Sequence, residues 1–343
     1  MGFCKQLQIW TFQILGLLNT ERRQILILCI RRYERINRKH ATQKGNAVKI
    51  LVTGGAGFLG SHVADALTEA GHAVTIFDKT PSPYCQASQR MVTGDLLDRQ
   101  LMDTLARDAD VIYHFASIAD IDECKEKPVE TAQINILGTV YLLDASIKTN
   151  VKRFVFASSA YVYSDAGYFY RCSKQACESY IETYHKLYGL EYTCLRYGSL
   201  YGLRADRRNS IFNIINSAIR EKKIVYHGTG QEIREFIHVL DAAKISVRIL
   251  EPEFANENVN LTGTERMTYA ELLDMIKEML HGQVEICISS ATRDAHYINT
   301  PYNFSPKLGR KLIQNPHIDM GQGLLQCMAE AFERMNGNSG TDQ

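Results

Sequence analysis

The stretch "VKILVTGGAGFLGSHVADALTEAGHAVTIFDK", residues 48–79, constrains the fold of this chain more than any other feature. An apolar run over 48–53 is bounded by Gly54, and Val63, Ala66 and Leu67 then recur at helical spacing. A second apolar run ends at Asp78. This pattern predicts a strand, a glycine-rich turn, a helix and a second strand, which is how a parallel α/β sheet begins.

The glycines at 54, 57 and 60 have the spacing that allows a tight turn and a close approach of backbone to a pyrophosphate. Backbone N–H groups at the start of the following helix favour negative charge. Asp78 comes 18 residues after Gly60, where a carboxylate can accept hydrogen bonds from an adenosine ribose and would repel a 2′-phosphate. We therefore predict a dinucleotide site that prefers NAD to NADP. A purely structural glycine turn is the alternative.

Strand-like and helix-like segments continue to alternate up to about residue 203. They include "ADVIYHFAS", a predicted helix near 129–149, "RFVFASS", a predicted helix at about 170–188 and "EYTCLRYGSLYG". Repeated units of this kind predict a Rossmann-type, doubly wound parallel sheet with ligands at the carboxyl ends of its strands. Beyond residue 203 the pattern is less regular, which indicates a smaller C-terminal substrate-binding portion. We expect an NAD-binding domain with the catalytic residues over 47–203, a mainly substrate-binding portion over 204–335 and a disordered tail over 336–343.

Tyr170 and Lys174, in "YFYRCSK", place a phenol one helical turn before an ammonium. A nearby positive charge favours phenolate over phenol, so such a pair can serve as an acid/base group near neutral pH. Tyr170 is the only one of the 18 tyrosines that a lysine follows at the fourth position. About one such pair is expected by chance, so an ordinary surface pair stays open on this observation alone.

The first 46 residues differ from the rest of the chain. They carry nine Lys or Arg against two Asp or Glu, and because the net charge is +1 the remainder is near −6. Such a remainder does not indicate nucleic-acid binding. The apolar runs of this extension are too short to span a bilayer, and no secretory cleavage site follows them. We expect a poorly ordered arm, or sequence upstream of the natural start, with a weak contact to an anionic membrane surface as the alternative.

The cysteines and histidines give no sign of a metal site. The nine cysteines are scattered and form no CxxC motif, which predicts reduced thiols in a cytoplasmic protein. Cys172 and Cys177 flank Lys174, but structural thiols are the simpler interpretation. His114, His238 and His296 share no close spacing.

Taken together, these motifs resemble the extended short-chain dehydrogenase/reductases, specifically the NAD-dependent nucleotide-sugar epimerase/dehydratase family of the UDP-glucose 4-epimerase-like kind. The resemblance covers roughly residues 48–330. It rests on "TGGAGFLG", Asp78, "GDL", "HFAS", Asn135 in "INILGTVYLLDA", "SSAYVYS", "YRCSK", "LRYGSLYG" and "GTGQEIREFIHV".

The resemblance implies roles for individual residues. Tyr170 is the expected acid/base, Lys174 holds the nicotinamide ribose, and Ser159 hydrogen-bonds the reacting sugar hydroxyl. Arg234 is expected to pair with the diphosphate of the substrate, which suits a planar, permanently charged guanidinium. The other expected substrate-binding residues are Tyr161, Ser199 and Arg293. The expected cofactor-binding residues are Gly54, Gly57, Phe58, Leu59, Gly60, Asp78, Asp95, Leu96, Phe115, Ala116, Ser117 and Lys174.

Departures from the family pattern gather around the expected sugar pocket. Dehydratases of this family have Asp–Glu directly after the catalytic Ser or Thr, where this chain has Ala160 and Tyr161. A 4,6-dehydratase is therefore disfavoured, and the resemblance implies a 4-epimerase acting on a UDP-hexose or UDP-N-acetylhexosamine. In addition, the segment 163–170 is short, Arg171 replaces a common glycine, and Gly198–Ser199 replaces a common Phe–Asn.

Three further expectations stay open. A UDP-sugar 5,6-dehydratase keeps the same redox residues and is the alternative reaction. A non-catalytic NAD sensor or scaffold on the same fold is the alternative of another class. We also expect a homodimer, because helices on such sheets often pair subunits by two-fold symmetry.

Overall fold

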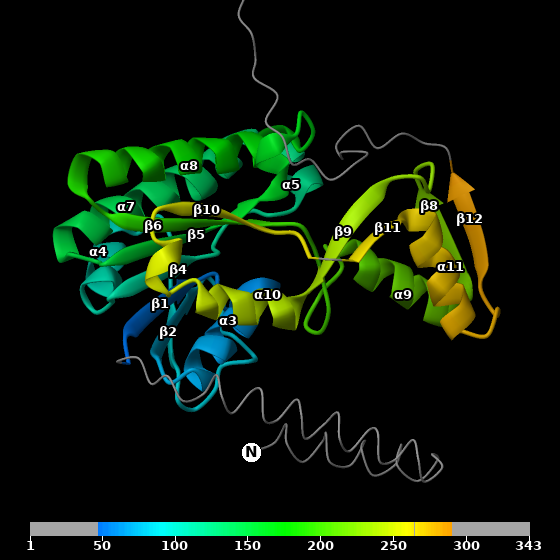
Figure 1. The fold of residues 1–343 in the computed structure, drawn as a ribbon, viewed down its shortest axis with the longest axis horizontal. Helices are drawn as coiled ribbons and strands as arrows, with labels where there is room; N and C mark the ends of the chain where they lie inside the picture. Colours follow the sequence, from blue (N-terminus) through cyan, green and yellow to red (C-terminus); the bar gives the residue numbers. More distant parts are fainter. Residues whose placement is uncertain (1–46, 264, 290–343) are drawn as a thin grey trace, which may run out of the picture. The chain divides into compact units, whose positions relative to one another are not determined.

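The computed structural model describes residues 47–263 and 265–289 and contains a seven-stranded sheet in the order β10-β6-β5-β4-β1-β2-β3 (Figure 1). All of its neighbouring strands run parallel. The order reverses between β1 and β4, which is where a doubly wound sheet opens a crevice for ligands. This confirms the predicted fold class. The strands are β1 (Lys49–Thr53), β2 (Ala73–Asp78), β3 (Arg90–Thr93), β4 (Val111–His114), β5 (Arg153–Ser159), β6 (Glu191–Tyr197) and β10 (Glu257–Leu261).

Helices cover both faces of this sheet because successive strand residues point to opposite sides. On one face, buried side chains of the strands pack on α3 (Phe58–Glu69) and α10 (Val239–Arg248). On the other face they pack on α4 (Arg99–Arg107), α7 (Gly138–Thr149) and α8 (Tyr168–Tyr188). Figure 1 shows these two layers of helices on either side of the sheet.

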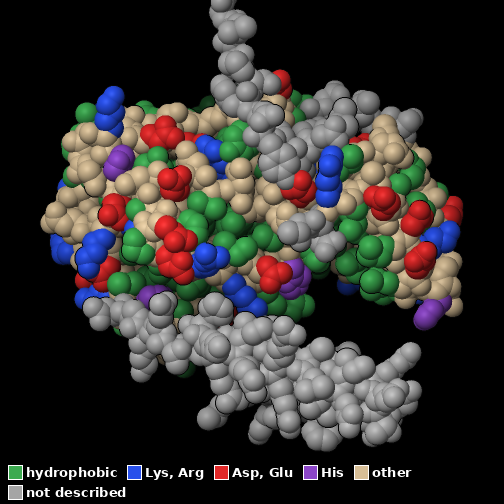
Figure 2. Space-filling model, in the orientation of Figure 1, with side chains coloured by type: hydrophobic (Ala, Val, Ile, Leu, Met, Phe, Trp, Pro, Cys, Tyr) green, Lys and Arg blue, Asp and Glu red, His purple; other side chains and the backbone are tan. Residues whose placement is uncertain are grey.

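Charged side chains of both signs are interspersed on the face shown in Figure 2. No helix among residues 47–263 and 265–289 is long and apolar enough to cross a membrane.

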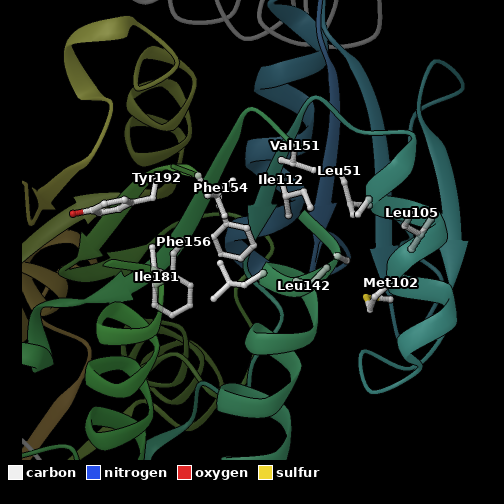
Figure 3. Close-up of a cluster of buried hydrophobic side chains, with 14 of the residues drawn as sticks. Leu51, Met102, Leu105, Ile112, Leu142, Val151, Phe154, Phe156, Ile181 and Tyr192 are labelled. Atoms are coloured by element: carbon white, nitrogen blue, oxygen red, sulfur yellow. The ribbon is translucent and has the colours of Figure 1, made fainter. Parts of the chain in front are cut away.

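Figure 3 shows the core beneath α4, α7 and α8. Met102 and Leu105 come from α4, Leu142 from α7 and Ile181 from α8, and they meet the strand side chains. All of these helical residues are at most 4% exposed. This core fixes α8, and therefore its Tyr170 and Lys174, against the sheet.

The helix predicted near 129–149 is divided into three parts. They are α6 (Pro128–Thr131), a π-helical turn (Ala132–Leu137) and α7. Such π-turns are rare and occur often at functional sites. The helix predicted from about residue 170 begins at Tyr168, just after Gly167, whose φ of 94° is in the left-handed region. A short helix, α5 (Ile121–Glu126), precedes α6.

Beyond residue 203 the chain forms smaller sheets and also returns to the main sheet. A three-stranded sheet has the order β11-β9-β7, and a two-stranded sheet pairs β12 with β8. However, α10 packs on α3, and β10 pairs with β6 from Glu257–Thr193 to Leu261–Tyr197. The main sheet and its helical layers therefore include a segment that the sequence pattern did not single out. The remaining elements are β7 (Ser199–Tyr201), α9 (Ser210–Glu221), β8 (Lys223–His227), β9 (Ile233–His238), β11 (Glu265–Thr268), α11 (Tyr269–Met279) and β12 (Glu285–Ser289).

Candidate active site

A cleft of about 1130 Å³ follows the carboxyl ends of β1 to β6. It crosses the point where the strand order reverses, as expected for a doubly wound sheet. All three predicted catalytic residues, Ser159, Tyr170 and Lys174, line it. All predicted cofactor-binding residues line it as well: Gly54, Gly57, Phe58, Leu59, Gly60, Asp78, Asp95, Leu96, Phe115, Ala116, Ser117 and Lys174.

The glycine turn has no room for side chains. A Cβ on Gly60 would lie 2.3 Å from the carbonyl oxygen of Gly54. Gly54 itself has a φ of 71°, and a Cβ there would lie 2.5 Å from the backbone nitrogen of Ala116. The backbone at the start of α3 is therefore bare and able to approach a pyrophosphate closely. At the end of β2 the Asp78 carboxylate accepts hydrogen bonds from the N–H groups of Ala56 at 3.0 Å and Thr80 at 3.3 Å. The residues present fit an NAD molecule.

Lys174 lies at the base of the cleft and is 3% exposed. Its ammonium donates hydrogen bonds to the Ala157 carbonyl oxygen at 2.8 Å and to Ser117 Oγ at 3.4 Å. It also lies 5.7 Å from the centre of the Tyr170 ring. Burial lowers the pKa of Lys174 to about 8, so its charge is costly to keep inside the protein.

Ser159 ends β5, and a 3-10 turn (Ala160–Tyr163) follows it at once. Ser159 Oγ accepts a hydrogen bond from the N–H of Tyr161 at 3.3 Å. The Tyr161 ring stands edge-on to the Tyr170 ring, with 6.1 Å between the ring centres, and Ala160 is buried. The two positions that carry acids in dehydratases thus hold a buried methyl group and a phenol next to Tyr170.

Unlike the predicted catalytic and cofactor-binding residues, most of the predicted substrate-binding residues do not line the cleft. Tyr161 contacts the Tyr170 ring but does not line the cleft, and Ser199 lies between two lining residues, Gly198 and Leu200. Arg234 is 5% exposed, and its guanidinium lies 5.7 Å from the centre of the Tyr269 ring. Arg293, like the extension 1–46, lies outside the described residues.

A second pocket of about 350 Å³ adjoins the cleft. Ala119, Asp120 and Arg208 line both spaces, and Tyr226 lines the second pocket. The Tyr226 ring stacks on the Tyr269 ring with 4.7 Å between their centres, and Arg234 contacts Tyr269 without lining the second pocket. No motif or spacing in the sequence singles out Arg208.

Asn135 lies in the π-turn and connects the cleft to α8. Its side-chain amide donates to the Ile118 carbonyl oxygen and to Ser173 Oγ, both at 3.0 Å, and its oxygen accepts from the N–H of Ile118 at 2.8 Å. Asn135 is 2% exposed, so these three bonds satisfy the buried amide. In the sequence, Asn135 is evident only as part of the motif "INILGTVYLLDA".

The other polar candidates have structural partners. His114 Nδ1 lies 2.6 Å from Thr53 Oγ1 and its Nε2 lies 2.9 Å from Thr139 Oγ1, and burial lowers the pKa of its ring to about 3. Burial also raises the pKa of the Cys177 thiol. The six described cysteines are free thiols. Among residues 47–263 and 265–289, no group of three His, Cys, Asp or Glu side chains could hold a metal ion.

Residues 50–262 match the model of the NAD dependent epimerase/dehydratase family. A Methanocaldococcus jannaschii protein provisionally named UDP-glucose 4-epimerase is 32% identical over 299 residues, which is 80% of this chain and 95% of the relative. A UDP-N-acetyl-alpha-D-glucosaminuronate decarboxylase of Bacillus cytotoxicus is 30% identical over 69% of this chain and 82% of its own length. The structure of the Thermotoga maritima UDP-glucose 4-epimerase with UDP-glucose is similar with a TM-score of 0.68 and 26% identity, covering 75% of this chain and 90% of that chain.

Proposed function

The chain belongs to the NAD-dependent epimerase/dehydratase family, and from this premise we propose that it is a 4-epimerase of a UDP-hexose or UDP-N-acetylhexosamine. The observation that carries the proposal is the convergence of Ser159, Tyr170 and Lys174 on the cleft that the glycine turn borders. The alternative of a non-catalytic sensor gives no reason for these three side chains to meet there. Two relatives support the sugar nucleotide, since one is a UDP-glucose 4-epimerase solved with UDP-glucose and another is a UDP-N-acetylglucosamine 4-epimerase.

The chain's own residues supply proton transfer and orientation. A bound NAD would supply the acceptor for the hydride of sugar C4 and the source of its return to the other face. Tyr170 takes the proton of the C4 hydroxyl and later gives it back. Lys174 stabilises the phenolate by its charge, and Ser159 orients the hydroxyl through a hydrogen bond. The buried Ala160 offers no acid that could expel the C6 hydroxyl, which favours epimerisation over 4,6-dehydration.

We further propose that residues 204–335 are a mainly substrate-binding portion. Arg208 supports this proposal because it lines both the cleft and the second pocket, where a diphosphate would pass from the sugar toward the base. Arg234, Ser199 and Arg293 are retained as substrate-binding residues in this proposal. For Arg234, which is 5% exposed, this requires that the substrate gain access to a buried guanidinium.

A second candidate reaction is 5,6-dehydration, and the place of Tyr161 favours it. A second phenol beside Tyr170 could act as an additional acid or base toward C5 or C6. Product analysis separates the two reactions, because elimination leaves an alkene and epimerisation leaves a saturated sugar.

The test is NMR analysis of products from several UDP-sugars in deuterium oxide. A C4 epimer without deuterium on carbon is expected, since hydride returns to the same carbon. Tyr170→Phe should slow turnover by about a hundredfold or more and leave NAD binding nearly unchanged. Tyr168→Phe is the matched control, because it removes a phenol from the same helix outside the cleft. An alkene, a stable 4-keto-6-deoxy sugar or deuterium at C5 would reject simple epimerisation.

We also propose a homodimer formed through α8. Tyr180, Leu187 and Tyr188 are 46%, 65% and 59% exposed, and their spacing places them on one face of this helix. A two-fold axis would bring two copies of this apolar face together. Light scattering should show a dimer for the wild type and a monomer for Leu187→Glu.

We propose a cytoplasmic enzyme, with weak contact of residues 1–46 to anionic membranes as a further possibility to test. Flotation with anionic and neutral vesicles, using the full chain and a chain lacking residues 1–45, checks this contact. Equal flotation of both chains would contradict membrane contact through residues 1–46.

A further inference from the structure

The segment that carries Ser159 is tied to α8 by three side chains. Lys174 donates to the carbonyl oxygen of Ala157 at 2.8 Å, and Gln175 donates to that of Val162 at 2.8 Å. Between them, Ser158 Oγ donates to Glu178 Oε1 at 2.5 Å. The same helix that carries Tyr170 therefore holds the chain on both sides of Ser159.

Glu178 differs from the other two because it is itself held in a fixed direction. Arg196 on β6 donates from Nε to Oε1 at 2.9 Å and from Nη2 to Oε2 at 2.7 Å. The two side chains are 9% and 13% exposed. Burial disfavours the charged guanidinium, but hydrogen bonds and attraction from Glu178 outweigh it and raise the pKa of Arg196. The Arg196 guanidinium therefore keeps its charge at neutral pH.

Arg196 extends this contact to the far end of the 3-10 turn. Its Nη1 donates to the Tyr163 hydroxyl, and its guanidinium carbon lies 4.7 Å from the centre of the Tyr163 ring. The Tyr163 hydroxyl in turn donates to Asn260 Oδ1 on β10 at 3.1 Å. The network thus runs from α8 across β6 to β10 and fixes both ends of the turn that follows Ser159.

A buried ion pair adds little net stability, because desolvation of the two charges offsets most of their attraction. Its directional bonds do fix geometry, and misplacement of a reacting group by about 1 Å can cost about a hundredfold in rate. We infer that Glu178, held by Arg196, is a positioning residue that sets Ser159 against Tyr170 for proton transfer. This inference rests on the proposed function.

The test compares Glu178→Gln with Arg153→Gln. Arg153 lies at the amino end of β5, is 8% exposed, and pairs with Glu191 and donates to the carbonyl oxygens of Ile249 and Glu251. It matches Glu178 in burial and also has a charged partner, but it lies at the opposite end of the strand from Ser159. Both substitutions should lower the Tm.

Only Glu178→Gln should lower kcat, by about ten- to a hundredfold, with KM and the Kd for NAD within about threefold of wild type. Hydrogen exchange in the peptide 157–163 should become at least about tenfold faster in Glu178→Gln and stay at the wild-type rate in Arg153→Gln. If Glu178→Gln is too unstable, Glu178→Gln/Arg196→Gln removes both charges and should regain Tm but not kcat.

Several results would overturn the inference. One is a kcat that falls no further in Glu178→Gln than in Arg153→Gln. Others are unchanged exchange in 157–163, or a double variant that regains both Tm and kcat. If the wild type turns over no UDP-sugar, the proposed function fails, and the exchange comparison still decides whether Glu178 holds the Ser159 segment.

Discussion

Replacing Lys174 with methionine should stabilise the cofactor-free protein while it abolishes turnover. The ordinary lysine pKa of 10.5 falls to about 8 in the folded protein, chiefly because of burial. This fall corresponds to about 3 kcal/mol of unfolding free energy, at about 1.4 kcal/mol for each factor of ten. Methionine has a similar length and carries no charge, so the variant does not bury a charge at this position.

The pH dependence of the stability difference between Lys174→Met and the wild type tests this argument more directly than the difference at one pH. Between about pH 8 and pH 10.5, Lys174 keeps its proton in the unfolded protein and loses it in the folded protein. The free energy of unfolding of the wild type therefore rises with pH in this range. The cost of Lys174 is therefore fully present below about pH 8 and falls to about 1.5 kcal/mol near pH 9.5.

Urea unfolding at about pH 7 and about pH 9.5 should show that the advantage of Lys174→Met over wild type shrinks by about 2 kcal/mol. Lys186→Met, which changes an exposed lysine of the same helix, is the control and should show no such trend. An advantage that is independent of pH would refute the argument that burial of the Lys174 charge is costly.

Three other outcomes are expected. Asp78→Ser should narrow the preference for NAD over NADP in binding titrations, because it relieves repulsion of the 2′-phosphate; equal affinities in the wild type would contradict this. Gly60→Ala should weaken NAD binding by about tenfold or more and lower Tm, because its Cβ would lie 2.3 Å from the Gly54 oxygen and the turn must shift. Cys172 is exposed and should react with a thiol reagent well before the buried Cys177, as mass spectrometry of brief labelling can show.

The sequence predicted the parts of the site that lie within single elements. The glycine turn was evident because its three glycines and Asp78 belong to one strand–helix–strand unit. Helical spacing alone places Tyr170 and Lys174 on one face of a helix, whereas their roles in the site are what the family resemblance implies. Both predictions depend on local geometry, which a short stretch of sequence specifies.

The parts that the sequence analysis missed depend on pairing between distant segments. Strand β10 reads "ENVNL", a polar pattern suited to the sheet edge, and only its pairing with β6 brings it into the main sheet. Glu178 and Arg196 are 18 residues apart on a helix and a strand, so no periodicity connects them. Arg234 belongs to a motif of the sequence, but its contact with the Tyr269 ring of α11, 35 residues further along the chain, follows from packing.

Three of the four departures from the family pattern around the sugar pocket belong to one connected segment, residues 160–171, and the fourth is Gly198–Ser199. A Cβ on Gly167 would lie 2.7 Å from Cδ1 of Tyr161, so the short connection before α8 packs directly on that ring. The same ring stands edge-on to Tyr170, and Arg171 Nη1 holds the connection by donating to the Ser164 carbonyl oxygen at 3.0 Å. A glycine at 171 would release the connection, and a longer connection would leave Tyr161 without this support. Because these changes depend on one another, exchanging a single residue should damage the site, and a change of reaction would require the whole of 160–171 to be replaced.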